Sequence, residues 1–191
     1  MAVIATISSS PSPTSRTDAV LADVTHRLQR DGHVVVPIVL RDLPAQPLLH
    51  GVADDPAVAA AVAALEAADA VVVTTPVYKA AYSGLLKTFL DLLPQFALRG
   101  KVVLPLATGG AQAHVLAVDY ALRPVLASLA PSAITPGWFV LASQVTVFDS
   151  GDAVIDEDAA RPLREVTGIF LDAVAGASLL TVPAARREAV A

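Results

Sequence analysis

The stretch that decides the fold is Ala70-Val71-Val72-Val73-Thr74-Thr75, which Pro76 follows directly. It lacks the alternation of polar and apolar residues that marks a strand with one face in water. A continuous apolar, β-branched run of this length is typical of a strand buried on both faces of a parallel sheet. The sequence therefore predicts a central parallel strand over residues 70–75.

Working outward, four other segments have strand-like composition, and helical patterns separate them. The predicted strands are Val3–Ser8, His33–Leu40, Lys101–Thr108 and Trp138–Phe148. The predicted helices are Thr17–Asp31, Pro56–Ala68, Ser83–Leu93, Ala111–Leu129 and Asp156–Leu180, with a loop over Arg41–Asp55. Such alternation predicts an α/β domain of three layers, in which a five-stranded parallel sheet is covered by helices on both faces.

Composition limits the classes of protein to consider. The 191 residues predict one domain over residues 1–182 and a flexible tail at 183–191. The absence of cysteine excludes disulfides and thiolate chemistry, and four scattered histidines predict no metal site. A net charge of −5 argues against nucleic acid as a partner. No apolar run approaches the roughly 20 residues of a membrane span, so we expect a cytoplasmic protein with no membrane partner.

Ligands of open parallel sheets bind beyond the carboxyl ends of the strands, so the loops there are the candidate site. In the first such loop, residues 8–17, seven of ten residues carry a hydroxyl, Arg16 is present, no acid is, and a helix follows. Hydroxyl donors, Arg16 and a helix N-terminus suit a phosphate dianion. The alternative is a flexible loop in which Thr17 merely caps the helix. The glycine fingerprints of dinucleotide and P-loop proteins are absent, which favours a mononucleotide flavin.

The loops after the third and fourth strands are also unusual. Pro76 is expected to end the strand, and an aromatic residue beyond it, Tyr78, could lie against a planar ring. Gly109 and Gly110 allow close backbone approach and positive φ, so a planar ligand could lie over this loop. The alternative for both loops is an ordinary turn. We expect His114, which follows the glycines, to be able to touch a ligand.

Two runs of sequence resemble one enzyme family, the NADPH-dependent FMN reductases. The first is Thr-Pro-Val-Tyr-Lys at 75–79 with Tyr-Ser-Gly at 82–84, and the second is Lys-Val-Val-Leu-Pro-Leu-Ala-Thr-Gly-Gly at 101–110. With Ala113-His114 and the run at 116–126, the second resembles the branch that serves two-component alkanesulfonate monooxygenases. The resemblance extends from the first strand to about residue 150. It implies a flavodoxin-like fold with strand order 2-1-3-4-5 and a homodimer or homotetramer.

The resemblance also implies roles for individual residues. The residues it assigns to the FMN phosphate are Ser10, Ser15, Arg16 and Thr17. Those it assigns to the isoalloxazine are Pro76, Val77, Tyr78, Lys79, Thr108, Gly109 and Gly110. Tyr120 corresponds to a tyrosine on a π-helical bulge at the subunit interface, although a buried interface aromatic is the alternative. Where the family has Gly-Ser-Pro, this chain has Ser9-Ser10-Pro11, so Ser9 would need a positive φ if that glycine has one.

The activity implied is hydride transfer from NADPH to FMN, with FMNH₂ passed to a partner monooxygenase in sulfonate-sulfur assimilation. The cofactors then carry the chemistry, so we predict no side-chain acid or base, and only an electrostatic role for Lys79 toward reduced flavin. One alternative is a reductase of quinones, azo compounds or metal oxyanions that keeps its flavin bound. A flavodoxin-type electron carrier and an inert scaffold are further alternatives.

Overall fold

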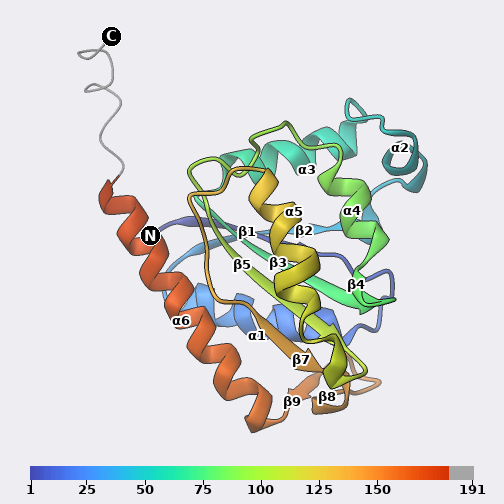
Figure 1. Cartoon of the computed structure of the whole chain (residues 1–191), viewed down its shortest axis with the longest axis vertical. Helices are drawn as coiled ribbons and strands as arrows, with labels where there is room; N and C mark the ends of the chain where they lie inside the picture. The colour runs from blue at the N-terminus through green and yellow to red at the C-terminus, as the bar shows by residue number, and fades with distance from the viewer. Residues whose placement is uncertain (181–191) are drawn as a thin grey trace.

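A twisted sheet with helices on both faces forms the core of the computed structural model, which describes residues 1–180 (Figure 1). The strands are β1 Val3–Ser8, β2 Val34–Val39, β3 Ala70–Tyr78, β4 Ala81–Tyr82, β5 Val102–Gly109, β6 Ala133–Ile134, β7 Trp138–Leu141, β8 Val145–Val147 and β9 Ala153–Ile155. The α-helices are α1 Arg16–Arg30, α2 Ala45–His50, α3 Pro56–Ala67, α4 Gly84–Leu90, α5 Arg123–Ser128 and α6 Glu157–Leu180. Shorter 3-10 turns occupy Leu40–Asp42, Gln112–His114 and Ala142–Gln144, and a π-helix occupies Val118–Leu122.

The sheet confirms the parallel α/β architecture but not the predicted count of five strands. It has seven strands in the order β2-β1-β3-β5-β6, with β7 also on β5 and the short β4 antiparallel to β3. Of the predicted strand Trp138–Phe148, only β7 joins the sheet. The rest turns away at Ala142–Gln144 and forms β8, which pairs with β9 in a separate antiparallel hairpin.

The edge beyond β5 is divided between β6 and β7 because two prolines and a close contact interrupt the ladder. Pro105 and Pro136 have no N–H to donate. A Cβ on Gly137 would lie 2.4 Å from the carbonyl oxygen of Pro105, so only glycine fits where the chain passes β5. The edge therefore bulges between its two paired segments.

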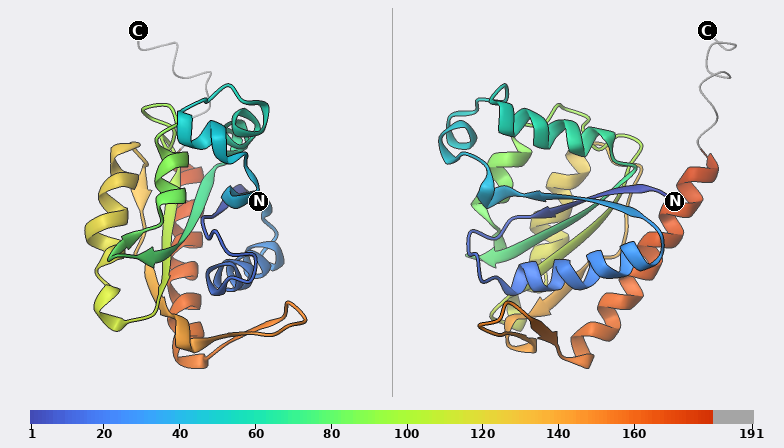
Figure 2. Two further views of the ribbon diagram at one scale, coloured as in Figure 1. Left: turned by 90° about the vertical axis from the view of Figure 1, so that its right-hand side faces the viewer. Right: turned by 180° about the vertical axis from the view of Figure 1, so that it is seen from behind.

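The two faces of the sheet carry separate cores because side chains alternate along buried strands. On β3, Val71 and Val73 face the core formed with α3, α4 and α5, whereas Ala70 and Val72 face the core formed with α1 and α6. Figure 2 shows these helices on opposite sides of the sheet. The three-layer arrangement predicted from alternation is thus present.

Several predicted boundaries are wrong. The helix predicted over Ala111–Leu129 is a 3-10 turn, a π-helix and then the short α5, with Pro124 in the first turn of α5 where its missing N–H costs little. The loop predicted over Arg41–Asp55 contains α2. Pro76 does not end its strand, since it pairs with Thr108 and β3 continues to Tyr78. The predicted tail, 183–191, lies outside the described residues. Among residues 1–180, no helix is both long and apolar enough to cross a bilayer.

Candidate functional site

Three loops meet at the carboxyl edge of the sheet. They are the hydroxyl loop (residues 8–17), the β3–β4 hairpin (residues 75–83) and the glycine loop (residues 107–114). Ser8 pairs with Thr74 across β1 and β3, and Pro76 pairs with Thr108 across β3 and β5, so the three parallel strands run toward the same edge, where β3 extends beyond the end of β1. The structure therefore brings the predicted loops together.

In the hydroxyl loop, most of the predicted phosphate residues are buried. Ser10 is buried, and its Oγ accepts a hydrogen bond from the N–H of Ser12. Ser15 is the N-cap of α1 and accepts from the N–H of Asp18 at 3.2 Å. The first N–H groups of α1 have no acceptor within the helix, so this end carries partial positive charge. Arg16 is exposed and its Nε donates to the carbonyl of Val145 at 3.0 Å, which leaves the terminal nitrogens of its guanidinium to face a ligand.

Thr17 and Thr108 bond to each other across two loops. Their hydroxyl oxygens lie 2.6 Å apart, and both side chains are buried. A shared bond uses one of the two hydroxyl protons, so the second hydroxyl keeps its proton for another acceptor. Thr17 is thus more than the helix cap of the alternative interpretation, because Ser15 performs that capping.

Asp18 is the carboxylate nearest in sequence to the phosphate residues, and it is neutralised. Arg41, just beyond β2, forms an ion pair with it, and the Ser8 hydroxyl donates to it. Both partners of the ion pair are partly buried, so water and salt screen their attraction less than they would in an exposed pair. Its charge therefore opposes an anion at the α1 N-terminus only weakly.

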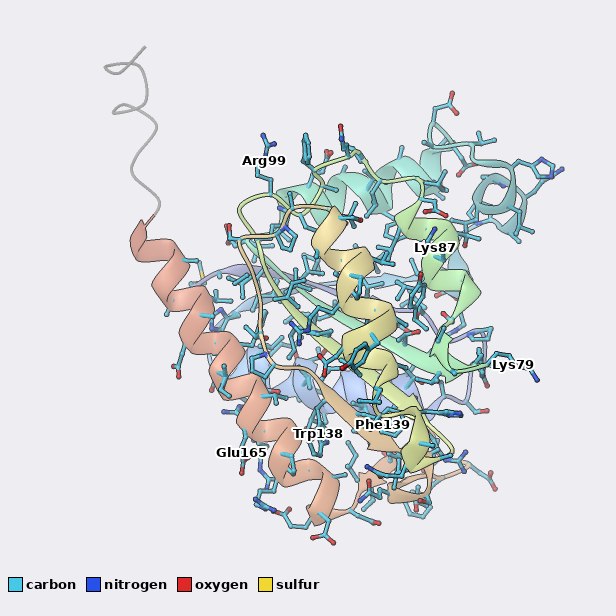
Figure 3. All side chains as sticks on the ribbon, viewed as in Figure 1. Lys79, Lys87, Arg99, Trp138, Phe139 and Glu165 are labelled. Carbon is cyan, nitrogen blue, oxygen red and sulfur yellow. The ribbon has the colours of Figure 1, made fainter. Side chains whose placement is uncertain are left out.

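The β3–β4 hairpin turns through two residues with left-handed backbone. Lys79 has φ 50° and Ala80 has φ 63°, and Tyr78 pairs with Ala81 on either side of them. This is the type I′ geometry that usually selects Asn or Gly, so both residues carry strain. Pro76 and Val77 are buried, Tyr78 is half-exposed, and the Lys79 side chain extends away from the sheet beyond its carboxyl edge (Figure 3).

The two glycines of the glycine loop have different roles, and neither adopts the positive φ that glycine allows. A Cβ on Gly109 would lie 2.9 Å from the ring of Phe139, so the ring requires glycine there. A Cβ on Gly110 would meet nothing within 4 Å, and the residue is exposed. Ser9 also needs no positive φ, since such angles among the described non-glycine residues occur at Lys79, Ala80 and Ala130. The Nδ1 atom of His114 is buried without a hydrogen-bond partner in the described structure.

Beside the glycine loop, the π-helix Val118–Leu122 carries Tyr120 on the surface. Tyr120 is 79 % exposed, and Leu116 and Val115 near it are also exposed. The π-helix also contacts β4. Exposure in the single chain agrees with both interpretations of Tyr120, since each places it at a subunit interface.

A hollow of about 1000 Å³ opens next to the hydroxyl loop, between α1, the β8–β9 hairpin and the start of α6. Its walls include Ser15 and Arg16, and they carry acidic residues such as Asp23 and Glu157. The β3–β4 hairpin and the glycine loop take no part in its lining. The hollow therefore lies on the α1 side of the hydroxyl loop, apart from the two other loops of the candidate site.

The residues present fit FMN. Hydroxyls, an arginine and a helix N-terminus lie at one end of the edge, and the acid nearest them is paired. At the other end, Gly110 presents exposed backbone with open space at its Cβ position, and Tyr78 of the β3–β4 hairpin is half-exposed. A phosphate and a flat ring can therefore be held by different loops of the same edge.

Sequence reasoning missed the bonds that hold the loops together. Asp18 and Arg41 had no motif to mark them, and Phe139 was not distinguished from other strand residues. Ser83 was noted only as a residue near a helix start, yet its hydroxyl reaches Ser9 in the hydroxyl loop. A serine three residues before an apolar helical position signals a cap, but nothing local signals its second partner.

Comparison with known proteins gives consistent matches. Residues 2–146 match the family described as NADPH-dependent FMN reductase. Two proteins named FMN reductase (NADPH), from Pseudomonas putida and Escherichia coli, are each 48 % identical to the chain. The first alignment covers 75 % of this chain and 73 % of the relative, and the second covers 74 % of each. The apo structure of the NADH:FMN oxidoreductase EmoB superposes with a TM-score of 0.80 at 42 % identity, over 89 % of this chain and 88 % of that one.

Proposed function

The chain belongs to the NADPH-dependent FMN reductase family, and from this premise we propose that it supplies FMNH₂ to a partner monooxygenase in sulfonate-sulfur assimilation. As a member of that family it is an oxidoreductase that uses FMN and NADPH. The observation that carries the proposal is the meeting of the hydroxyl loop, the β3–β4 hairpin and the glycine loop at one edge of the sheet. In this proposal the enzyme acts in the cytoplasm, where NADPH and the partner are available.

The two substrates supply the hydride donor and acceptor, so the protein's task is to bind and orient them. We assign the phosphate to the hydroxyl loop, through Ser10, Ser15, Arg16 and the α1 N-terminus. Thr17 contributes through its bond to Thr108. We assign the ring to residues 76–79 and 108–110. No side-chain acid or base is needed. Lys79 adds positive charge at the edge where reduced flavin gains negative charge.

The part of the site to which we assign the ring is open to solvent, and this supports release of the flavin product. Tyr78 is half-exposed and Gly110 has free space above it, so residues 1–180 leave this end of the site open. The assignment to sulfonate metabolism is supported by the resemblance over residues 101–110 and 116–126.

We also propose that the chain forms a homodimer or homotetramer through the exposed apolar face around Tyr120. Val115, Leu116 and Tyr120 are large apolar residues exposed next to one another in sequence. Exposed apolar clusters of this kind mark protein interfaces. Tyr120→Ser should reduce the mass measured by light scattering, whereas Ile169→Ser, at an exposed residue of α6, should leave it unchanged.

The decisive experiment measures NADPH oxidation by the purified protein with and without free FMN. A colourless protein whose rate requires added FMN and saturates with it would support flavin as a substrate. A yellow protein whose rate is indifferent to free FMN would contradict the proposal and favour a reductase of quinones, azo compounds or metal oxyanions. A protein that binds FMN but oxidises no NADPH would instead indicate an electron carrier.

A further inference from the structure

We propose that Ser83 is a positioning residue for FMN, which fixes the distance between the phosphate end and the ring end of the site without touching the flavin. This inference rests on the proposed function, because it assigns the two ends of FMN to the hydroxyl loop and the β3–β4 hairpin. Ser83 is the last residue of that hairpin and is 1 % exposed.

Ser83 links three segments of the chain, two through its hydroxyl and one through its backbone N–H. It donates to the carbonyl oxygen of Ser9 at 2.9 Å, and its oxygen accepts from the N–H of Leu86 at 3.1 Å as the N-cap of α4. The N–H of Ser83 donates to Oγ1 of Thr75 at 2.9 Å, which closes the base of the hairpin. The side chain therefore joins the hydroxyl loop to the start of α4, and the backbone of the same residue holds the base of the hairpin.

Ser9 is the receiving end of this link, and it is fully buried. Its N–H and its Oγ both donate to the carbonyl of Thr74, at 3.2 Å and 2.8 Å. Together with the bond from Ser83, these contacts hold the chain just before Ser10 against β3. The position of the following phosphate residues relative to the hairpin is thereby set by buried bonds.

This spacing matters because phosphate and ring are two ends of one ligand. Each end can bind fully only if the other is held at the matching distance, and a displacement of about 1 Å in a binding constellation is costly. Weakening the link should therefore penalise a ligand that has both ends more than a ligand with only one. Riboflavin, which has the ring but no phosphate, is the natural probe of the difference.

The test compares the dissociation constants of FMN and riboflavin, measured by flavin fluorescence, in the wild type and in Ser83→Ala. We expect the constant for FMN to rise about five- to tenfold, the equivalent of one neutral hydrogen bond, and that for riboflavin to change less than about twofold. Asp55→Ala is the matched control, because it removes the N-cap of α3, whose bonds are to Ala57 and Val58 only. It should change neither constant.

Ser9→Ala provides a second variant if Ser83→Ala does not fold, since it removes the bonds of the Ser9 hydroxyl to the carbonyl of Thr74 and to the Ser83 hydroxyl but keeps the Ser9 carbonyl that accepts from Ser83. It should raise the FMN constant in the same selective way by a smaller factor. Equal increases for FMN and riboflavin, or no increase for FMN, would overturn the inference while leaving wild-type FMN reduction intact. A wild type that does not reduce FMN would instead overturn the proposed function.

Discussion

The amino and carboxyl edges of the sheet both contain buried polar side chains, but they use them differently. At the amino edge, Lys101 is 7 % exposed and its Nζ donates to the backbone carbonyls of Glu66, at 2.8 Å, and Ala68. These carbonyls lie at the end of α3, where a helix leaves acceptors without partners. The lysine therefore completes the backbone of a helix terminus.

At the carboxyl edge, the buried polar groups join loops to one another. Ser83 reaches Ser9, and Thr17 reaches Thr108. The edges also differ at their tight turns, because positive φ at the amino edge falls on Gly100 as well as on Ala130, whereas in the β3–β4 hairpin both such residues, Lys79 and Ala80, carry side chains. The comparison teaches that one edge is arranged for stability, and the other holds loops in fixed positions for a ligand at some cost in strain.

The largest effect should come from Lys101→Met at the amino edge. It leaves two carbonyls without their donor in a buried place, so we expect a loss of about 2–3 kcal/mol in the free energy of unfolding. Urea unfolding measures the loss, and FMN affinity of the folded protein should be unchanged. A loss of FMN affinity with unchanged stability would break the division between the edges.

The pH dependence of stability sharpens this prediction. Burial lowers the pKa of Lys101 below its ordinary value of 10.5. As pH rises between the lowered and the ordinary pKa, the folded protein loses this proton before the unfolded chain does. The unfolded chain then binds more protons, so the contribution of Lys101 to stability rises with pH through that window and is constant below it. The difference between the wild type and Lys101→Met should therefore grow in alkaline solution, and a shrinking difference would contradict the assignment.

Substitutions at two adjacent glycines should separate the free energy of unfolding from FMN affinity at the carboxyl edge. Gly109→Ala places a Cβ against the Phe139 ring and should lower the free energy of unfolding by about 2 kcal/mol. Gly110→Ala meets open space, so it should leave stability unchanged and lower the affinity for FMN severalfold by covering exposed backbone. Thermal unfolding and flavin titration of both variants measure the two effects. A stable Gly110→Ala protein with wild-type FMN affinity would show that the ring binds elsewhere.

The elements that could be predicted from sequence are those with a local cause. The run Ala70–Thr75 is apolar without alternation because both of its faces are covered, and the structure confirms it as part of β3. The division of the last strand could not be predicted, because it depends on Pro105, Pro136 and Gly137 meeting across two segments. The hairpin turn was missed because Lys79 and Ala80 are not the residues that such turns normally contain.

The candidate site shows the same contrast between features that have a local cause in the sequence and features that depend on contacts between distant residues. The predicted loops meet as expected, because parallel strands end at a common edge. The bonds that hold them were not predictable, since Ser83 and Ser9 are 74 residues apart and Thr17 and Thr108 are 91 apart. The sequence shows that Gly109 allows positive φ, but the reason for a glycine there is the Phe139 ring, which no local pattern places beside it.

A smaller change in the free energy of unfolding tests whether hydrogen bonds between loops stabilise the carboxyl edge. Thr17→Val and Thr108→Val each remove one hydroxyl of the 2.6 Å pair. We expect a coupling of about 1 kcal/mol in a double-mutant cycle on the free energy of unfolding, because the second removal has no bond left to break. Thr17→Val with Thr135→Val is the control, since the Thr135 hydroxyl donates to the carbonyl of Val103 instead. Additive effects in the first cycle would show that the two hydroxyls do not act as a pair.

The smallest effect concerns the tight turns that distinguish the two edges. Ala80→Gly should raise the free energy of unfolding by about 0.5 kcal/mol. Glycine removes the steric cost of left-handed backbone in the folded protein. It also raises the conformational entropy of the unfolded chain, which offsets part of that stabilisation. Gly100→Ala, at φ +82° and with open space around its Cβ position, should do the opposite and lower it by about 1 kcal/mol. Paired urea titrations measure both. Should Ala80→Gly be destabilising, the strain assigned to the β3–β4 hairpin would be absent, and the two edges would differ only in their hydrogen bonds.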